Sequence, residues 1–367
     1  MAFSLETYVI DIIEGRRKSP FVRAPLRFAA LLFGLAVRMR HRFADHGEGR
    51  GKRAVPLPVI SIGNIVAGGT GKTALVRKIG KDLPSALRPA VLLRGYRSEV
   101  ERSGGNLLLR PHTDLPAEVC GDEALLLQRA HPRLCLIVGK NRLLSAQKAV
   151  REGADLILLD DGLQYRKLRR DIEVIVLHGD DPYGKGHYLP RGYLRDTPER
   201  LRHADYLFVN HVRDLSRFSS LKKELEKKTD APLIAMRPDP AGIEGEGILR
   251  QKGEGERVVA VFCGLGNPTS FLRTVTDMGY SIRSTMLLPD HRAPTRDALR
   301  NFALRARAEG CERILCSDKD RVKLADPSAY ALPIHYVKIS LKIVAGQKYY
   351  ERLLRDIISL AKMRKAL

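Results

Sequence analysis

The chain has 367 residues, which is longer than most single domains, so we expect two α/β domains of unequal size. Hydrophobic residues make up 44% of the sequence and no long low-complexity tract is present, which excludes a largely disordered protein. The 64 Lys and Arg against 42 Asp and Glu give a formal net charge of +22. This charge favours phosphates, nucleic acid or an anionic membrane as partners. The sequence carries no zinc-finger spacing and no RNP-type aromatic motif, so we expect no nucleic-acid partner.

The N-terminal segment, residues 1–56, is expected to be helical and to carry no secretory signal. Residues 28–37 are apolar for ten positions, about half of what a spanning helix needs, and arginines flank them. Two interpretations remain open: a helix lying at an anionic membrane surface, or a core helix with solvated ends. Five cysteines without a CxxC pair are typical of reduced thiols in the cytosol.

Residues 57–236 alternate between apolar runs and helical patterns. Residues 57–62 predict a buried strand, residues 63–71 a loop and residues 72–80 the start of a helix. Further strands are expected at 90–94, 134–138, 156–159, 172–177 and 206–209, and further helices at 123–130 and 141–152. The alternation predicts an α/β fold of the P-loop NTPase type, in which helices cover both faces of a mostly parallel sheet. Ligands are expected at the carboxyl ends of the strands.

The passage 237–255 is rich in proline and glycine and is the predicted interdomain linker. Residues 256–367 are expected to form a smaller α/β domain. Its predicted strands are 257–262 and 313–316, and its last helix runs from 347 to 363.

The loop before the first predicted helix of the core contains Gly68-Gly-Thr-Gly-Lys-Thr73. A Walker A loop has glycine where Val66 stands, and deviant P-loops carry a signature lysine where Ala67 stands. Glycines let backbone N–H groups turn toward phosphates, and the helix that follows adds its positive N-terminus. A strand before the loop and a helix after it favour this interpretation over a glycine-rich turn without a ligand. The expected nucleotide-binding residues are Val66, Ala67, Gly68, Gly69, Thr70, Gly71, Lys72 and Thr73.

Within that loop, Lys72 is expected to contact the β- and γ-phosphates of ATP, and Thr73 to bind Mg²⁺. Asp160 and Asp161 follow four aliphatic residues and should emerge at the same edge of the sheet. Two adjacent acids are costly to cluster without a cation, so we predict that they bind Mg²⁺ with Thr73, although one of them could be an ordinary helix N-cap.

Several phrases, in order from about residue 57 to residue 325, resemble the tetraacyldisaccharide 4′-kinase family. They are Ser61-Ile-Gly-Asn64, Arg94-Gly-Tyr96, Gly121-Asp-Glu123, Asp160-Asp-Gly-Leu-Gln164, Leu189-Pro-Arg-Gly192, Leu194-Arg195, Phe262-Cys-Gly-Leu-Gly-Asn-Pro268, Pro289-Asp-His291 and Ser317-Asp-Lys-Asp320. This ordered set is far more specific than a P-loop alone.

The resemblance implies transfer of the ATP γ-phosphate to the 4′-hydroxyl of a tetraacyldisaccharide 1-phosphate, which gives lipid IVA in lipid A biosynthesis. It implies ATP and Mg²⁺ as co-substrate and cofactor, and an acylated disaccharide lipid and an anionic membrane surface as partners. A peripheral position at the cytoplasmic face of the inner membrane follows, with no obligate protein partner. An enzyme with such an acceptor must meet a bilayer, which favours the membrane interpretation of the N-terminal helix.

The resemblance also implies roles for single residues. Asp122, acting with His291, would activate the acceptor hydroxyl. Without the resemblance, Asp122 is equally explained as a helix N-cap, and His291 as a surface turn residue. Because the predicted linker separates them, we expect domain closure to bring them together. Four residues in loops at strand ends are candidate contacts to phosphate or substrate, with solvated surface side chains as the alternative: Arg94, Tyr96, Arg191 and Arg195.

The chain departs from the family pattern at Leu163, Tyr165 and Asp196, where the family usually has phenylalanine, histidine and glutamate. These departures leave the nucleotide loop intact and affect acceptor-side details. A rival class is a deviant P-loop ATPase that works as a nucleotide switch. It explains the loop and the paired acids but not Asp122 or His291.

Overall fold

The computed structural model describes residues 5–17, 19–45, 53–111, 113, 115–244, 257–265, 268–289, 292–321, 324 and 330–365. The chain divides into two compact units. The first unit contains residues 1–93, 141–237 and 343–367, and the second contains residues 94–140 and 238–342.

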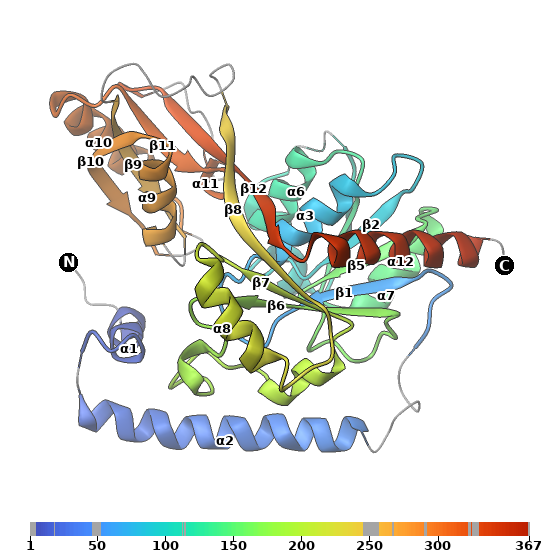
Figure 1. The fold of residues 1–367 in the computed structure, drawn as a ribbon. Coiled ribbons are helices and arrows are strands. Elements are labelled where there is room, and N and C mark those ends of the chain that lie inside the picture. The colour runs from blue at the N-terminus through green and yellow to red at the C-terminus, as the bar shows by residue number, and fades with distance from the viewer. Residues whose placement is uncertain are drawn as a thin grey trace. The chain divides into compact units, whose positions relative to one another are not determined.

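The first unit is built on parallel strands (Figure 1). Its strands are β1 (Val59–Gly63), β2 (Pro89–Leu93), β5 (Leu156–Asp160), β6 (Ile172–His178), β7 (Tyr206–Asn210) and the start of β8 (Leu233–Glu244). Its helices are α1 (Leu5–Ile13), α2 (Pro20–Asp45), α3 (Lys72–Asp82), α7 (Arg142–Arg151), α8 (Leu215–Leu225), α12 (Gln347–Lys365) and the short 3₁₀ helices η1 (Gly184–Gly186) and η2 (Pro198–His203).

The strand order in this unit is β8-β7-β6-β1-β5-β2. All five pairings are parallel, with Ile62 opposite Asp160 on one side of β1 and Val174 on the other. Every residue of β1, β2, β5 and β7 is buried, as expected for parallel strands that are covered on both faces. This burial explains why the strands could be predicted as continuous apolar runs.

A core cluster in the first unit packs the loop after β1 against the strands β6 and β7. Leu163 is fully buried there, and a Cβ on Gly63 would lie 2.4 Å from the Cβ of Leu163. Only glycine fits at that position of β1. The departure to Leu163 therefore fills a packing position beside the first strand.

Helix α2 is 26 residues long and exposes large apolar side chains on one face. The exposed side chains are Phe21, Phe28, Leu31, Leu32, Leu35 and Met39. The ten consecutive apolar residues are part of a longer segment, Pro20–Arg42, which has a mean hydropathy of 1.5 and is long and apolar enough to cross a membrane by length and composition. Core helices and N-terminal signal sequences share this length and composition, so the segment alone does not define a span.

The second unit contains strands β3 (Asn106–Leu109), β4 (Cys135–Gly139), β9 (Arg257–Cys263), β10 (Tyr280–Leu287), β11 (Arg313–Ser317) and most of β8 and β12 (Ile334–Ala345). Its helices are α4 (Glu99–Ser103), α5 (Ala117–Cys120), α6 (Asp122–Ala130), α9 (Pro268–Asp277), α10 (Arg296–Ala308) and α11 (Asp318–Arg321). Strands β10, β9, β11 and β12 pair in parallel, and β3 pairs antiparallel with β4. Two buried clusters cover the two faces of β9 and β11.

The domain boundaries differ from the sequence prediction. Residues 343–367, which include α12, belong to the first unit, although the prediction placed them in the smaller domain. Residues 94–140 belong to the second unit, although the predicted kinase core ran without a break from 57 to 236. The predicted linker 237–255 is strand as far as Glu244, and its remaining residues lie outside the described part of the chain. Within the second unit, the Ser340 hydroxyl donates a hydrogen bond to the Asp239 carbonyl, so the Pro- and Gly-rich passage is held beside β12.

Candidate active site

The loop between β1 and α3 has the form of a phosphate cradle. It turns at Gly68, with φ of 105°, and at Gly71, with φ of 93°, and α3 begins at Lys72. A Cβ on Gly68 or Gly69 would meet nothing within 4 Å, so the loop surface is open there. The Asn64 amide donates a 2.9 Å hydrogen bond to the Thr70 hydroxyl, which fixes the curve of the loop.

The two positions that depart from known loop types pack against a neighbouring segment. Val66 is buried and its backbone forms an isolated antiparallel β-bridge with Leu194, and the Ala67 N–H donates to the Tyr193 carbonyl. The Ala67 N–H is thus already used within the protein. The sequence prediction begins the nucleotide-binding residues at Val66, and the open part of the loop begins at Gly68.

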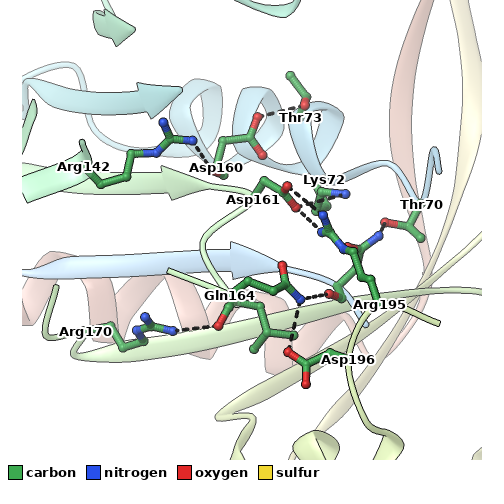
Figure 2. A network of polar contacts seen from close by, with 12 residues as sticks. Thr70, Lys72, Thr73, Arg142, Asp160, Asp161, Gln164, Arg170, Arg195 and Asp196 are labelled. Carbon is green, nitrogen blue, oxygen red and sulfur yellow. Dashed lines mark hydrogen bonds and ion pairs between the residues drawn. The ribbon is translucent and has the colours of Figure 1, made fainter. Parts of the chain in front are cut away.

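The Thr73 hydroxyl donates a 2.8 Å hydrogen bond to Asp160, which ends β5 and is 3% exposed (Figure 2). This contact follows from the pairing of β1 with β5, which brings the start of α3 to the end of β5. Arg142, the first residue of α7, is also buried, and its guanidinium lies 3.5 Å from the Asp160 carbonyl oxygen. Asp160 and Thr73, which were both predicted to bind Mg²⁺, are therefore in direct contact.

Asp161, with φ of 54°, turns toward two cations. The Lys72 ammonium lies 3.4 Å from its carboxylate, and Arg195 donates to both of its oxygens (Figure 2). Burial disfavours ionisation of Asp161, but the charges of Lys72 and Arg195 outweigh it and hold the pKa of this carboxyl well below its usual range. Three predicted site residues are thus one cluster of charges at the edge of the sheet.

The side-chain oxygens of Thr73, Asp160 and Asp161 suit Mg²⁺ as ligands. They are a hydroxyl and two carboxylates, and Mg²⁺ in phosphoryl-transfer sites takes one or two carboxylates together with substrate phosphates. Among the described residues, no group of three or more His, Cys, Asp or Glu side chains could hold a metal ion by itself, without ligands from a substrate. Thr73, Asp160 and Asp161 are therefore the side chains that fit a magnesium ion shared with a nucleotide.

A second set of polar contacts joins this site to α2. The Gln164 amide donates to the Asn64 carbonyl and to Asp196, which is 1% exposed. Asp196 also lies 2.5 Å from the Nε2 of His41 and 3.4 Å from the Arg40 guanidinium, both on α2. Asp196 therefore faces α2 in this structure, where the family commonly has glutamate.

The proton on His41 can be placed from its partners. Arg166 can only donate, and it contacts Nδ1, so Nδ1 accepts and Nε2 donates to Asp196. Burial lowers the pKa of His41 although Asp196 favours its charged form. A neutral ring thus links the end of α2 to a buried carboxylate.

The departure at Tyr165 also has a local explanation. The Leu143 N–H donates to the Tyr165 hydroxyl, which lies 3.2 Å from the Asn141 side chain that caps α7. Tyr165 therefore helps to satisfy the N-terminus of a helix. A histidine function at this position does not carry over.

Arg191 lies in the loop between η1 and η2, and its surroundings are basic. Burial lowers the pKa of the neighbouring His187, and the charges of Arg191 and Arg27 of α2 act in the same direction. Positive charge is therefore concentrated where α2 meets this loop.

In the second unit, Arg94 pairs with Glu101 at 2.5 Å, and Tyr96 is exposed beneath the Arg97 guanidinium. Gly95 and Gly121 pack together, because a Cβ on Gly121 would lie 3.4 Å from the Cα of Gly95. This packing brings the motifs Arg94-Gly-Tyr96 and Gly121-Asp-Glu123 side by side. Asp122 begins α6 immediately afterwards and is partly exposed.

Described residues of three more family motifs, at 262–268, 289–291 and 317–320, meet elsewhere in the same unit. Asp320 accepts hydrogen bonds from the Gly264 N–H and the Ser317 hydroxyl, at 3.0 and 2.6 Å. A Cβ on Gly264 would meet the Pro289 and Arg292 carbonyl oxygens. Helix α11, which contains Asp320, contacts α6.

His291 lies outside the described residues. Residues 94–140 and 238–342 form one unit, however, so both segments belong to the same compact body. Asp122 therefore lies in the same unit as the described residues on either side of His291, and not in the first unit as the predicted domain boundaries implied.

Two buried residues of the site were not predicted. Asn210 ends β7, and its amide donates a 3.0 Å hydrogen bond to the Thr70 carbonyl, while Arg142 approaches Asp160. For Asn210, the available signal was a polar residue directly after the predicted strand 206–209, at the ligand-binding edge of a parallel sheet.

The strand order, the glycine loop and the Lys72–Thr73–Asp160 arrangement define a phosphate-binding protein of the P-loop α/β class. A sequence model described as tetraacyldisaccharide-1-P 4′-kinase matches residues 22–359. The chain therefore belongs to the tetraacyldisaccharide-1-P 4′-kinase family, which confirms the predicted resemblance.

Similarities to individual proteins agree with this family membership. The chain is 34% identical to the tetraacyldisaccharide 4′-kinase of Chlamydia trachomatis over 345 residues, or 92% of this chain and 89% of the relative. It is also 34% identical to that of Syntrophus aciditrophicus over 372 residues, or 94% and 96% of the two chains. A crystal structure of LpxK from Aquifex aeolicus in complex with ATP is similar, with a TM-score of 0.69 and 25% identity over 92% of this chain and 99% of that one. The predicted fold class is confirmed.

Proposed function

We propose that this chain transfers the γ-phosphate of ATP to the 4′-hydroxyl of a tetraacyldisaccharide 1-phosphate, giving lipid IVA in lipid A biosynthesis. The observation that carries the proposal is the open glycine loop, with Lys72 at its end and Thr73 bonded to Asp160. The family membership supplies the acceptor, and the loop supplies the reaction class.

On the nucleotide side, Lys72 and Arg195 supply positive charge to the phosphates. Both already lie at Asp161, so the charges are in place before a triphosphate arrives, and little reorganisation is needed. Thr73, Asp160 and Asp161 would hold Mg²⁺, which neutralises charge on the phosphates when bound. The direct bonds from Asn64 to Thr70 and from Gln164 to Asn64 keep the loop in shape.

On the acceptor side, Asp122 takes the proton of the sugar hydroxyl, with His291 as its partner. A sugar hydroxyl is a weak nucleophile and needs a base within hydrogen-bond reach as the new bond to phosphorus forms. Asp122 is a partly exposed residue in the first turn of α6, so its carboxylate lies at the positive end of a helix.

Arg94, Tyr96 and Arg191 are proposed contacts to phosphate or to the disaccharide. Arg94 is held by Glu101, which orients its guanidinium, and Tyr96 is exposed beside it. Arg191 shares a basic neighbourhood with Arg27, which would suit the 1-phosphate of an acceptor that approaches along α2.

Helix α2 is proposed to dock peripherally on the cytoplasmic face of the inner membrane. Its exposed face carries Phe28, Leu31 and Leu35, with arginines at both ends of the helix. Apolar side chains below the headgroups and guanidinium groups among them are the pattern of an interfacial helix. The opposite face packs on the first unit, where a Cβ on Gly34 would lie 2.7 Å from the Tyr188 ring.

The test is transfer of label from γ-labelled ATP to a tetraacyldisaccharide 1-phosphate in mixed detergent micelles. We expect labelled lipid with the wild-type protein and none with Lys72→Ala. ATP hydrolysis without labelled lipid would reject the kinase and favour the nucleotide switch. Stimulation of hydrolysis by DNA or RNA would contradict the expected absence of a nucleic-acid partner.

A further inference from the structure

The loop between β5 and β6 carries two residues of the candidate site and ends at an ion pair that the proposed mechanism does not use. Asp161 and Gln164 lie in this loop. Arg170 lies at its end, and its guanidinium donates a 2.6 Å hydrogen bond to the Glu173 carboxylate in β6. The Arg170 side chain is 15% exposed and that of Glu173 is 6% exposed. A pair buried to this extent is weak evidence for stability, because desolvation of the two charges offsets their attraction.

The Arg170 guanidinium also holds the backbone of the loop on both sides of Gln164. One of its nitrogens contacts the Leu163 carbonyl oxygen at 3.5 Å, and another donates to the Tyr165 carbonyl. Figure 2 shows Arg170 directed toward the segment that carries Gln164. A guanidinium can serve several acceptors at once because its N–H groups form a rigid planar fork. The carbonyls before and after Gln164 are therefore tied to one side chain.

The sheet fixes the Glu173 end of this arrangement. Strand β6 lies between β1 and β7, and the Glu173 N–H donates a 2.7 Å hydrogen bond to the Asp205 carboxylate. The Asp205 N–H donates in return to the Glu173 carbonyl at 2.9 Å. A carboxylate on an inner strand thus holds Arg170, and Arg170 holds the loop. Support from a rigid element in this way keeps a functional side chain in one orientation.

Gln164 carries this support to the phosphate loop. Its amide donates to the Asn64 carbonyl at 3.0 Å and to the Asp196 carboxylate at 3.3 Å. The phosphate loop has two further anchors at Thr70, because the Asn64 and Asn210 amides both donate to that residue. A displaced Gln164 should therefore leave most of the ATP affinity in place. It should lower the rate of transfer, because small errors in the geometry of reacting groups are costly.

We propose that Arg170, held by Glu173, is a positioning residue for phosphate transfer, because it fixes the orientation of Gln164 between Asn64 and Asp196. The proposal rests on the proposed function for its effect on the rate. Its effect on the loop follows from the contacts of Arg170 alone. The ion pair thereby acts on the reaction through Gln164, in addition to any contribution it makes to stability.

The first test is a double-mutant cycle of Arg170→Lys and Gln164→Ala, with transfer of label from γ-labelled ATP to the lipid as the assay. Lysine keeps a positive charge beside Glu173 but lacks the planar fork, so it cannot hold both carbonyls. Each single variant should lower kcat roughly tenfold and change the KM for ATP less than about threefold. The combined variant should lose little more than either one, because both changes release the same side chain. Arg169→Lys, at the exposed neighbouring arginine, is the matched control and should keep the wild-type kcat.

A second variant separates positioning from stability. Arg170→Met combined with Glu173→Leu removes both charges, so no buried ion is left unpaired and the fold should be kept. Its kcat should be at least as low as that of Arg170→Lys, because the carbonyls beside Gln164 have lost their donor. A folded double variant with wild-type kcat would mean that the ion pair has only a structural role.

Hydrogen–deuterium exchange tests the loop without any transfer assay. The Gly162 and Tyr165 N–H groups donate to carbonyls at 3.2 and 2.9 Å, and in Arg170→Lys they should exchange about tenfold faster. The amides of α8 are the internal control and should keep their wild-type exchange. Wild-type kcat in Arg170→Lys, additive losses in the cycle, or unchanged exchange in the loop would each overturn the positioning role. A wild-type protein that gives no labelled lipid refutes the proposed function, and the exchange result then decides the role of Arg170 by itself.

Discussion

The two units hold the family sequence motifs in position by different physical means. In the first unit, charged and polar side chains bind one another across the loop, as in the contacts of Thr73 with Asp160 and of Arg195 with Asp161. In the second unit, glycines let backbone segments touch, as where Gly121 meets Gly95, and Asp122 is left partly exposed. The first arrangement is preorganised for a polyanion, and the second places one acidic residue, Asp122, at the N-terminus of a helix. The difference suggests that nucleotide binding and acceptor activation can be separated by mutation.

The largest expected effect tests this separation directly. Lys72→Ala and Asp122→Asn should each lower phosphate transfer at least about 100-fold, because one removes charge at the proposed phosphate site and the other removes the proposed base. Only Lys72→Ala should clearly weaken ATP binding, as measured by calorimetry. A comparable loss of ATP affinity in both variants would mean that Asp122 does not act on the hydroxyl.

Arg195 sharpens the comparison within the first unit. Arg195→Ala should lower transfer roughly 10- to 100-fold, because the bidentate pairing with Asp161 and one positive charge are both lost. Arg195→Lys keeps the charge without the planar fork, so its activity should lie between those of Arg195→Ala and the wild type. If Arg195→Lys were no better than Arg195→Ala, geometry rather than charge would account for the whole effect. Wild-type activity in Arg195→Ala would show that the arginine has no role in transfer.

The second unit should respond through stability. Asp320→Ala leaves the buried Gly264 N–H and Ser317 hydroxyl without their acceptor, which should lower the free energy of unfolding by about 1–3 kcal/mol. Urea denaturation measures this change. Glu312→Gln, at an exposed position of the same unit, is the control and should stay within about 0.5 kcal/mol of wild type. Wild-type stability in Asp320→Ala would mean that these buried contacts are not needed.

The smallest effect is expected on α2, outside both sites. Phe28→Ser with Leu31→Ser should weaken binding to anionic vesicles roughly tenfold while transfer to a lipid in detergent micelles is kept. Leu215→Ser removes a similarly exposed leucine from α8 and should leave vesicle binding unchanged. Equal vesicle binding by the double variant and the wild type would contradict docking through this face. Release of the wild-type protein from membranes by salt or carbonate supports a peripheral position, whereas resistance to both supports a span.

Much of the first unit could be predicted because its strands are buried on both faces. The runs at β1, β5, β6 and β7 were located to within two residues at each end, since continuous aliphatic sequence is what such strands require. The prediction failed at β8, where Pro238 and Pro240 suggested a linker. Its extended path depends on neighbours distant in the sequence, such as Ser340, and no local pattern reveals those.

The candidate site was only partly predictable for the same reason. Lys72, Thr73 and Asp160 follow from motif spacing, because a strand and a helix fix where they emerge. Asn210 could not be found this way, since its role depends on which strand lies two places from β1 in the sheet. The assignment of residues 94–140 to the second unit depends likewise on tertiary packing.

The contact between α2 and Asp196 changes how a shortened protein should be judged. His41 and Arg40 are partners of a carboxylate that is 1% exposed, and that carboxylate in turn holds Gln164 at the start of the phosphate loop. Removing the segment before Pro56 to gain solubility would strip a buried anion of these partners as well as removing a greasy surface. Solubilising substitutions on the exposed face of α2 are therefore the sounder route to a lipid-free preparation than truncation.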